Sequence, residues 1–250
     1  MNRFFVADLQ NHLRDLHLSG EEYHHCTHVM RQGPGDAVVL FDGKGLEVKA
    51  RIKDVTKNEA SLDMIHQSTT PALPYSITLA QAIPKGKCMD SIVQKATEIG
   101  AKQIIPLISQ RTVVQVSDEK AESKIGKWIQ ITIEAAKQCG INWLPEVLPP
   151  VSLKEFFNQK HTFDLLLIAS LQPDAVHFKK VLEDFTLDTK GKKPNKVLVL
   201  IGPEGDFTPA EISLSKASGC QPITLGPQVL RSETAAIYCL SIIAHELQGV

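Results

Sequence analysis

Two strand-loop-helix stretches near the end of the chain constrain its fold more than any other feature. The first begins with Lys196–Ile201, a run of valine, leucine and isoleucine that is typical of a buried strand. Gly202 and Pro203 stop this strand and allow the backbone to approach a ligand closely. Thr208 is followed by a proline and, three residues on, by Glu211, which predicts a capping box at the start of a helix.

The second stretch repeats this pattern. Residues 222–225 predict a short apolar strand, which Gly226 and Pro227 interrupt. Ser232 is predicted to cap a closing helix that extends to about His245. Because an open α/β sheet binds its ligand at the carboxyl ends of its strands, the two stretches predict one site built from two loops.

The rest of the second half of the chain alternates between strand and helix patterns. Strands are predicted at 76–83, 103–108 and 163–169, and helices at 89–99, 118–140 and 174–185. Gly100 follows the first of these helices and is predicted to end it. Such alternation predicts an α/β domain with a parallel sheet covered by helices on both faces.

The two glycine-containing loops carry a family resemblance. Gly-Pro-Glu-Gly at 202–205 and Leu-Gly-x-x-x-Leu-Arg-x-Glu-Thr-Ala at 225–235 resemble the signature of the bacterial ribosomal RNA small subunit methyltransferase E family. One such loop would fit a glycine turn in any other α/β protein, but two in order favour the family. The resemblance implies a SPOUT-type sheet with a deep trefoil knot. It also implies methyl transfer from S-adenosylmethionine to N3 of a uridine in 16S rRNA.

Other segments match the family pattern, with three departures. Residues 85–100 match its Lys-Gly…Met-Asp…Gln-Lys-Ala-Thr-Glu-Leu-Gly segment, and 134–140 match Glu-Ala-x-x-Gln-x-Gly. Ile141 and Gln228 stand where the family has arginine, so two polar or RNA contacts are expected to be missing. Asp206 replaces the glycine that follows Gly-Pro-Glu-Gly, which would alter the loop if that glycine adopts a positive φ.

The first part of the chain predicts a small β-rich domain. The turn Asp42-Gly43-Lys44-Gly45 indicates a hairpin, and residues 47–55 and 60–65 alternate between apolar and polar side chains. The family resemblance implies a PUA-like β-barrel that binds RNA. We therefore expect two domains, 1–70 and 75–250, joined by a linker that contains Pro71 and Pro74.

The resemblance also assigns site residues. The cofactor-binding residues are expected in the two loops, namely Leu200, Ile201, Gly202, Pro203, Glu204, Gly205, Leu225, Gly226, Val229 and Leu230. Deprotonation of uracil N3 leaves a negative charge on the ring, which Arg231 is expected to stabilise because its guanidinium stays protonated. Glu233 is expected to accept the proton or to orient Arg231, although an acid in the first turn of a helix has a structural explanation too.

RNA contacts are predicted from three arginines, since a guanidinium binds phosphate with two parallel hydrogen bonds. Arg3 and Arg31 lie in segments that match the family's first domain, and Arg111 follows the strand at 103–108. An ordinary surface or ion-pair role explains Arg3 and Arg31 equally well. The net charge of −1 gives no support for an RNA partner, so any basic surface must be local.

Metal and membrane sites are not predicted. His24, His25, Cys26 and His28 lie close together, but no second cluster completes a ligand set. Five scattered cysteines without a Cys-x-x-Cys pair indicate reduced thiols and a cytoplasmic protein. The first twenty residues lack the apolar core of a signal peptide, and the longest apolar run, 235–244, is too short to cross a bilayer.

The apolar closing helix leaves two explanations open. Ile237, Leu240, Ile242 and Ile243 fit the interface of a homodimer, but burial within one chain explains them as well. Two functional alternatives also remain: a SPOUT methyltransferase for another RNA position, and a non-catalytic ribosome-assembly or RNA-binding factor.

Overall fold

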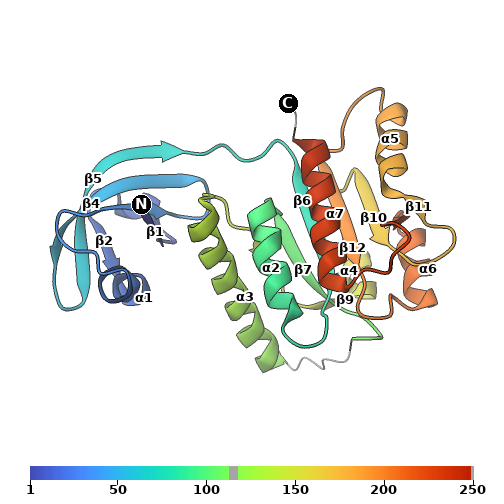
Figure 1. Ribbon diagram of the computed structural model, residues 1–250, viewed down its shortest axis with the longest axis horizontal. Coiled ribbons are helices and arrows are strands. Elements are labelled where there is room, and N and C mark those ends of the chain that lie inside the picture. Colours follow the sequence, from blue (N-terminus) through green and yellow to red (C-terminus); the bar gives the residue numbers. More distant parts are fainter. Residues whose placement is uncertain (113–117, 249–250) are drawn as a thin grey trace. The chain divides into compact units, whose positions relative to one another are not determined.

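The computed structural model describes residues 1–112 and 118–248, with the side chains of all of them except 118–120. The chain forms two compact units (Figure 1). The first consists of Met1–Ala72 and Ile133–Leu144, and the second of Leu73–Thr132 and Pro145–Val250. Helix α3 (Asp118–Cys139) contributes residues to both units.

The first unit is built on a curled five-stranded sheet with the order β1-β3-β4-β5-β2. The strands are β1 (Asn2–Phe5), β2 (Leu16–Ser19), β3 (Ala37–Phe41), β4 (Leu46–Val55) and β5 (Glu59–Thr69). Strand β1 pairs with β3 in parallel, and the other pairings are antiparallel. A 3₁₀ turn (Leu9–His12), helix α1 (Gly20–His24) and a π-helical turn (His25–Val29) complete the unit.

The predicted hairpin at 42–45 is confirmed. Strands β3 and β4 pair antiparallel on either side of it, with Phe41 opposite Glu47. The carboxylate of Asp42 accepts hydrogen bonds from the backbone N–H groups of Lys44 (2.7 Å) and Leu46 (3.0 Å), which fixes the turn. Alternate residues of β4 are buried, so one face of the curled sheet forms the core of this unit.

The second unit contains an eight-stranded sheet in which all pairings are parallel. Its order is β11-β13-β10-β12-β6-β7-β8, and β9 also pairs with β7. The strands are β6 (Ser76–Ala82), β7 (Gln103–Ile108), β8 (Glu146–Val147), β9 (Val151–Ser152), β10 (Leu165–Ala169), β11 (Val176–His177), β12 (Lys196–Ile201) and β13 (Gln221–Thr224). The parallel sheet predicted from the strand-helix alternation is confirmed.

Helices cover both faces of this sheet, as predicted. They are α2 (Cys88–Ile99), α4 (Leu153–Asn158), α5 (Phe178–Asp188), α6 (Pro209–Ala217) and α7 (Ser232–Leu247). Val197 and Val199 of β12 pack into one core with α2, α5 and α7, whereas Leu198 and Leu200 pack into a second core with α4 and α6. This alternation follows from the two-residue period of a strand.

Two helix boundaries predicted from the local sequence are confirmed, namely the start of α6 and the end of α2. Thr208 and Glu211 form the predicted capping box at the start of α6, with Pro209 as its first residue. Gly100 ends α2 in a left-handed conformation, with φ of 91°.

Two predictions about helix starts were wrong. The N-cap of α7 is Arg231, without a side-chain cap, and Ser232 is the first helical residue. The helix predicted from residue 174 begins at Phe178, because Val176 and His177 pair with β13 as the short strand β11. In both cases a contact with a distant segment overrides the local pattern. Within the described part of the chain, no helix has the length and apolar character needed to span a membrane.

Candidate functional site

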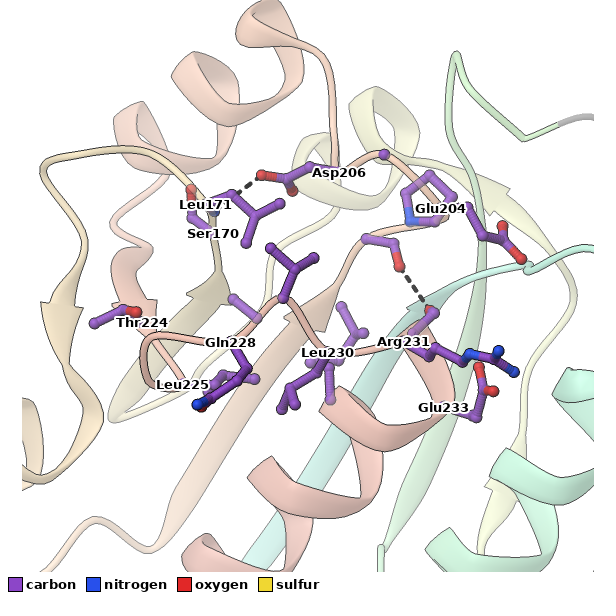
Figure 2. Close-up of a pocket in the computed structure, with 18 of the residues that line it drawn as sticks. Ser170, Leu171, Glu204, Asp206, Thr224, Leu225, Gln228, Leu230, Arg231 and Glu233 are labelled. Carbon is purple, nitrogen blue, oxygen red and sulfur yellow. Dashed lines mark hydrogen bonds between the residues drawn. The ribbon is translucent and has the colours of Figure 1, made fainter.

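A cavity of about 450 Å³ lies in the second unit at the carboxyl ends of β10, β12 and β13 (Figure 2). The loops after these three strands and the first turn of α7 form most of its wall. Its lining residues are Cys88, Ala169, Ser170, Leu171, Ile201, Gly202, Pro203, Glu204, Gly205, Asp206, Thr224, Leu225, Gly226, Gln228, Val229, Leu230, Arg231, Ser232, Glu233 and Ala235. This is the position at which an open α/β sheet binds its ligand.

The structure brings nearly all predicted cofactor residues to this cavity. Ile201, Gly202, Pro203, Glu204, Gly205, Leu225, Gly226, Val229 and Leu230 all line it. Leu200 does not, because its side chain is fully buried in the core beneath α4 and α6. The backbone of Leu200 pairs with Ile168 of β10, so its role is to hold the sheet under the loop.

The loop after β12 needs small residues. A Cβ atom on Gly202 would lie 3.2 Å from the backbone nitrogen of Phe207 and 3.2 Å from Asp206 Oδ1, which is tighter than most such contacts. Gly205 and Asp206 have φ values of 85° and 68°, in the left-handed region. Asp206 thus adopts the conformation that the family's glycine would adopt freely, so the loop path tolerates this departure.

A buried hydrogen-bond chain connects the two motif loops. The hydroxyl of Ser232 donates to the carbonyl oxygen of Gly202 (2.7 Å) and accepts from Nε2 of Gln81 in β6 (2.9 Å). Both Ser232 and Gln81 are buried. The first residue of α7 therefore holds the loop after β12 by its side chain.

Other loops are also joined to the loop after β12. The carboxylate of Glu204 accepts the backbone N–H of Lys85 (3.1 Å), which follows β6. Arg111, which follows β7, donates to the carbonyl oxygens of Gly205 and Asp206. The Gly202–Asp206 segment is therefore hydrogen-bonded to the segments after β6 and β7 and to the first residue of α7.

The predicted catalytic residues Arg231 and Glu233 lie together at one side of the cavity. Figure 2 shows their side chains pointing toward one another, the first from the N-cap and the second from the first turn of α7. Within the described residues, the guanidinium of Arg231 has no ion pair or hydrogen bond. It is exposed and therefore accessible to a ligand.

The predicted RNA contact Arg3 is engaged inside the first unit. Its side chain is 12% exposed and forms a 2.9 Å ion pair with Glu47. It also donates to the carbonyl of Ile141 (3.2 Å) and to the side chain of Asn142, and it lies over the Phe41 ring. Burial alone would raise the pKa of Glu47, but the hydrogen bonds from Arg3 and Asn142 outweigh it and lower that pKa.

The other two predicted RNA contacts differ from each other. Arg31 is exposed in the first unit and has a φ of 54°, just after the π-helical turn. Arg111 belongs to the second unit and uses its guanidinium to hold the Gly205–Asp206 turn, although its side chain remains exposed. A contact with RNA stays a prediction for all three arginines.

The histidine-rich segment serves local packing in the structure. His24 and His28 stack at 4.8 Å, and His25 contacts Phe4 edge to face. Cys26 is buried, and burial followed by the charges of Asp36 and Glu22 raises the pKa of its thiol to about 11. Among the described residues, no group of three or more potential metal ligands occurs.

One wall of the cavity was not predicted by any sequence motif. Ser170 and Leu171 follow β10, and Thr224 ends β13. The only signal for the first two was their position after a predicted buried strand, since carboxyl ends of parallel strands meet at one edge of the sheet. Cys88, at the start of α2, also lines the cavity and was not predicted.

Comparison with known proteins shows the family of the chain. The RNA methyltransferase domain family matches residues 71–244, and the RNA methyltransferase PUA domain family matches residues 18–65. The chain is 31% identical to ribosomal RNA small subunit methyltransferase E of Bacillus subtilis, over 99% of this chain and 98% of that protein. The chain belongs to the ribosomal RNA small subunit methyltransferase E family.

Solved structures extend the comparison to the fold. A methyltransferase from Legionella pneumophila with bound S-adenosylmethionine has a TM-score of 0.85 and 33% identity, over 98% of both chains. Ribosomal RNA small subunit methyltransferase E from Neisseria gonorrhoeae, also bound to S-adenosylmethionine, has a TM-score of 0.85 and 29% identity, over 98% of both chains. The PUA match falls within the curled sheet of the first unit, as the family resemblance implied.

Proposed function

We propose that this protein methylates N3 of a uridine in 16S rRNA of the small ribosomal subunit, with S-adenosylmethionine as the methyl donor. The observation that carries the proposal is the joining of both family motif loops into the wall of one cavity. Membership of the ribosomal RNA small subunit methyltransferase E family supports the RNA substrate and the enzymatic activity. The choice of uridine N3 rests on the resemblance of the two loops.

The cavity suits S-adenosylmethionine in size and charge. Its volume of about 450 Å³ lies within the usual range for small-molecule sites. Three acidic residues, Glu204, Asp206 and Glu233, line it against one basic residue, Arg231. This acidic surplus favours a ligand with a positive sulfonium centre. When bound, S-adenosylmethionine supplies an electrophilic methyl group.

Arg231 is proposed to stabilise the charge that develops on the uracil ring. Loss of the N3 proton spreads negative charge over the two ring carbonyl oxygens. The guanidinium of Arg231 lies at the wall of the cavity without a hydrogen-bond or ion-pair partner among the residues that the structure describes, so it can donate hydrogen bonds to such an oxygen. Because arginine remains protonated at neutral pH, this stabilisation needs no proton transfer from Arg231 itself.

Glu233 is proposed to act beside Arg231 in one of two ways. Its carboxylate lines the cavity and points toward Arg231, so it can accept the N3 proton or hold the guanidinium in place (Figure 2). The first role makes it a general base. The second makes it a positioning residue, and the pH dependence of turnover distinguishes the two.

RNA binding is proposed to involve both domains, 1–70 and 75–250, in the cytoplasm. The PUA match supports an RNA-binding role for the first. Arg31 is the stronger candidate there, because its side chain is exposed whereas Arg3 is held by Glu47. Arg111 is a candidate in the second domain, beside the loop that it holds.

We also propose a homodimer that uses α5 and α7, although Leu240 and Ile243, two of the four residues that first suggested it, are fully buried in the core of the second unit. A groove of about 660 Å³ lies between these helices, with Leu182, Ile242 and Leu247 on its walls. Leu187 and Tyr238 line it too and are 76% and 41% exposed, so apolar surface is available to a second copy of the chain. Sedimentation should show a dimer that Tyr238→Asp weakens.

The trefoil knot implied by the family resemblance is proposed for the C-terminal part of the chain. Its support is the close fold similarity to relatives of the family. Pulling the unfolded chain by its ends should give a contour length shorter than that of an unknotted chain of the same size. A full contour length would contradict the knot.

The function is tested by a methyl-transfer assay on small subunits and on naked 16S rRNA prepared from cells that lack this modification. The expected result is incorporation of labelled methyl at one uridine, with 3-methyluridine identified by mass spectrometry. Methyl incorporation at another nucleotide would indicate a SPOUT methyltransferase with a different target. RNA binding without incorporation would indicate a non-catalytic assembly factor.

A further inference from the structure

One wall of the cavity contains no family motif. It is bound by Asp206, which stands where the family pattern has glycine. The loop after β10 contributes Ser170 and Leu171 to this wall. Within it, the N–H of Ser170 is fixed by the carbonyl of Ile223 in β13 (3.0 Å). The N–H of Leu171 is bound instead by a side chain, Oδ2 of Asp206, at 3.0 Å (Figure 2).

Asp206 occupies a conformation that few residues other than glycine adopt. Its φ is 68°, and aspartate is among the side chains that tolerate this region best. Its second carboxylate oxygen, Oδ1, accepts the N–H of Phe207 at 2.7 Å. One carboxylate therefore accepts hydrogen bonds from two backbone N–H groups that belong to different loops. Hydrogen bonds to a charged acceptor are stronger than those between neutral groups.

The backbone of Asp206 is anchored as well. Arg111, from the loop after β7, donates to the carbonyl oxygen of Asp206 at 3.3 Å and also to that of Gly205. Arg111 therefore holds the backbone of Asp206, and the side chain of Asp206 binds the loop after β10. A glycine at this position would keep the φ angle but lose both carboxylate contacts.

We propose that Asp206 is a positioning residue that fixes the Ser170–Leu171 wall of the cofactor cavity. Cofactor affinity in this chain then depends on a carboxylate at a position where the family pattern has glycine. The affinity part of this inference rests on the proposed function, because it takes S-adenosylmethionine as the ligand. The anchoring of the loop does not depend on any ligand.

Asp206→Gly tests the proposal, since it removes the carboxylate without adding backbone strain. In the ligand-free protein we expect hydrogen exchange at the Leu171 amide to become about tenfold faster, as for the loss of one charge-assisted hydrogen bond. We expect the Kd for S-adenosylmethionine, measured by calorimetry, to rise about tenfold as well. Asp206→Asn retains one accepting oxygen and a tolerance for positive φ. Its exchange rate at Leu171 and its Kd should therefore lie between those of the wild type and those of Asp206→Gly.

Asp184→Asn is the matched control, because it removes an acid on α5, outside the cavity and the loop after β10, whose partner is Lys180. It should leave both readouts unchanged. Unaltered exchange at Leu171 in Asp206→Gly would overturn the anchoring, and an unaltered Kd would overturn the effect on affinity. If the wild type failed to bind S-adenosylmethionine while exchange at Leu171 still rose, the proposed function would fail and the anchoring would stand.

Discussion

The hydroxyl of Ser232 and the carbonyl oxygen of Gly202 lie 2.7 Å apart and form a hydrogen bond between residues thirty positions apart in the chain. This bond connects the start of α7 to the loop after β12. Because Gln81 of β6 donates to the same hydroxyl, three segments meet at one buried atom. The arrangement of the two motif loops is thus set by a polar contact inside the protein.

Ser232→Ala should weaken both stability and cofactor binding. The substitution leaves the Gly202 carbonyl and the Gln81 amide without this partner in a buried setting, which costs about 1–3 kcal/mol. Chemical denaturation should show that loss, and calorimetry should show weaker binding of S-adenosylmethionine. Ser241→Ala, an exposed serine on the same helix, is the control and should change neither value.

Arg231→Gln should reduce turnover and spare cofactor binding. Loss of one group that stabilises a developing negative charge typically lowers kcat by about 10²–10³-fold. The Kd for S-adenosylmethionine should stay close to the wild-type value, because Arg231 is assigned to the uracil. Arg231→Lys keeps the positive charge and should retain more activity than the glutamine variant. A large loss of cofactor affinity with normal kcat would contradict this assignment.

The rate at which Cys88 is alkylated should show whether S-adenosylmethionine occupies the cavity. Burial raises the pKa of the Cys220 and Cys239 thiols to about 12, so these should stay unreactive at neutral pH. Cys88 is half-buried and lines the cavity, whereas Cys139 is exposed in the first unit. Iodoacetamide should modify both, and S-adenosylmethionine should slow the reaction at Cys88 alone. Equal rates at Cys88 with and without the cofactor would place the binding site elsewhere.

The ion pair between Arg3 and Glu47 should make the first unit sensitive to acid. The folded-state pKa of Glu47 is lowered, so its contribution to stability is complete above the unfolded pKa of about 4.3. That contribution is lost as the pH falls through the lower folded-state pKa. Denaturation between pH 6 and pH 3 should therefore show a fall in unfolding free energy that is smaller in Glu47→Gln.

Removal of the arginine partner should be costly at neutral pH. Arg3→Ala leaves Glu47 and Asn142 partly buried without their partner, and we expect a loss of about 3–5 kcal/mol, as for other broken buried pairs. The matched control is Lys53→Ala, which breaks a pair with Asp63 in which both side chains are more than 60% exposed. It should cost less than about 1 kcal/mol. Equal effects of both substitutions would show that Arg3 has no special structural role.

The regular part of the fold was predictable from the sequence because its signals are local. Each long parallel strand is an apolar run, and α6 begins with a capping box that depends on residues three positions apart. The two motif loops were predictable as well, since glycine and proline mark the points at which β12 and β13 end.

The remaining features depend on contacts between distant residues. Ser232 fitted the pattern of an N-cap, but its hydroxyl is bound by Gly202 instead. Arg3 was predicted to contact RNA, with a surface or ion-pair role left open, and its actual partners Glu47 and Asn142 are 44 and 139 positions away. Ser170 and Leu171 carry no motif, so their place in the cavity follows only from the strand order of the folded sheet.

Calorimetric titration of S-adenosylmethionine into the wild type and Gly202→Val tests the central claim most directly. A side chain on Gly202, in the wall of the cavity, would crowd Phe207 and the Asp206 carboxylate, whereas Gly126→Val places the same side chain in open space on α3. We predict binding by the wild type and by Gly126→Val, and no binding by Gly202→Val with unchanged circular dichroism. No binding by the folded wild type would contradict the enzymatic role.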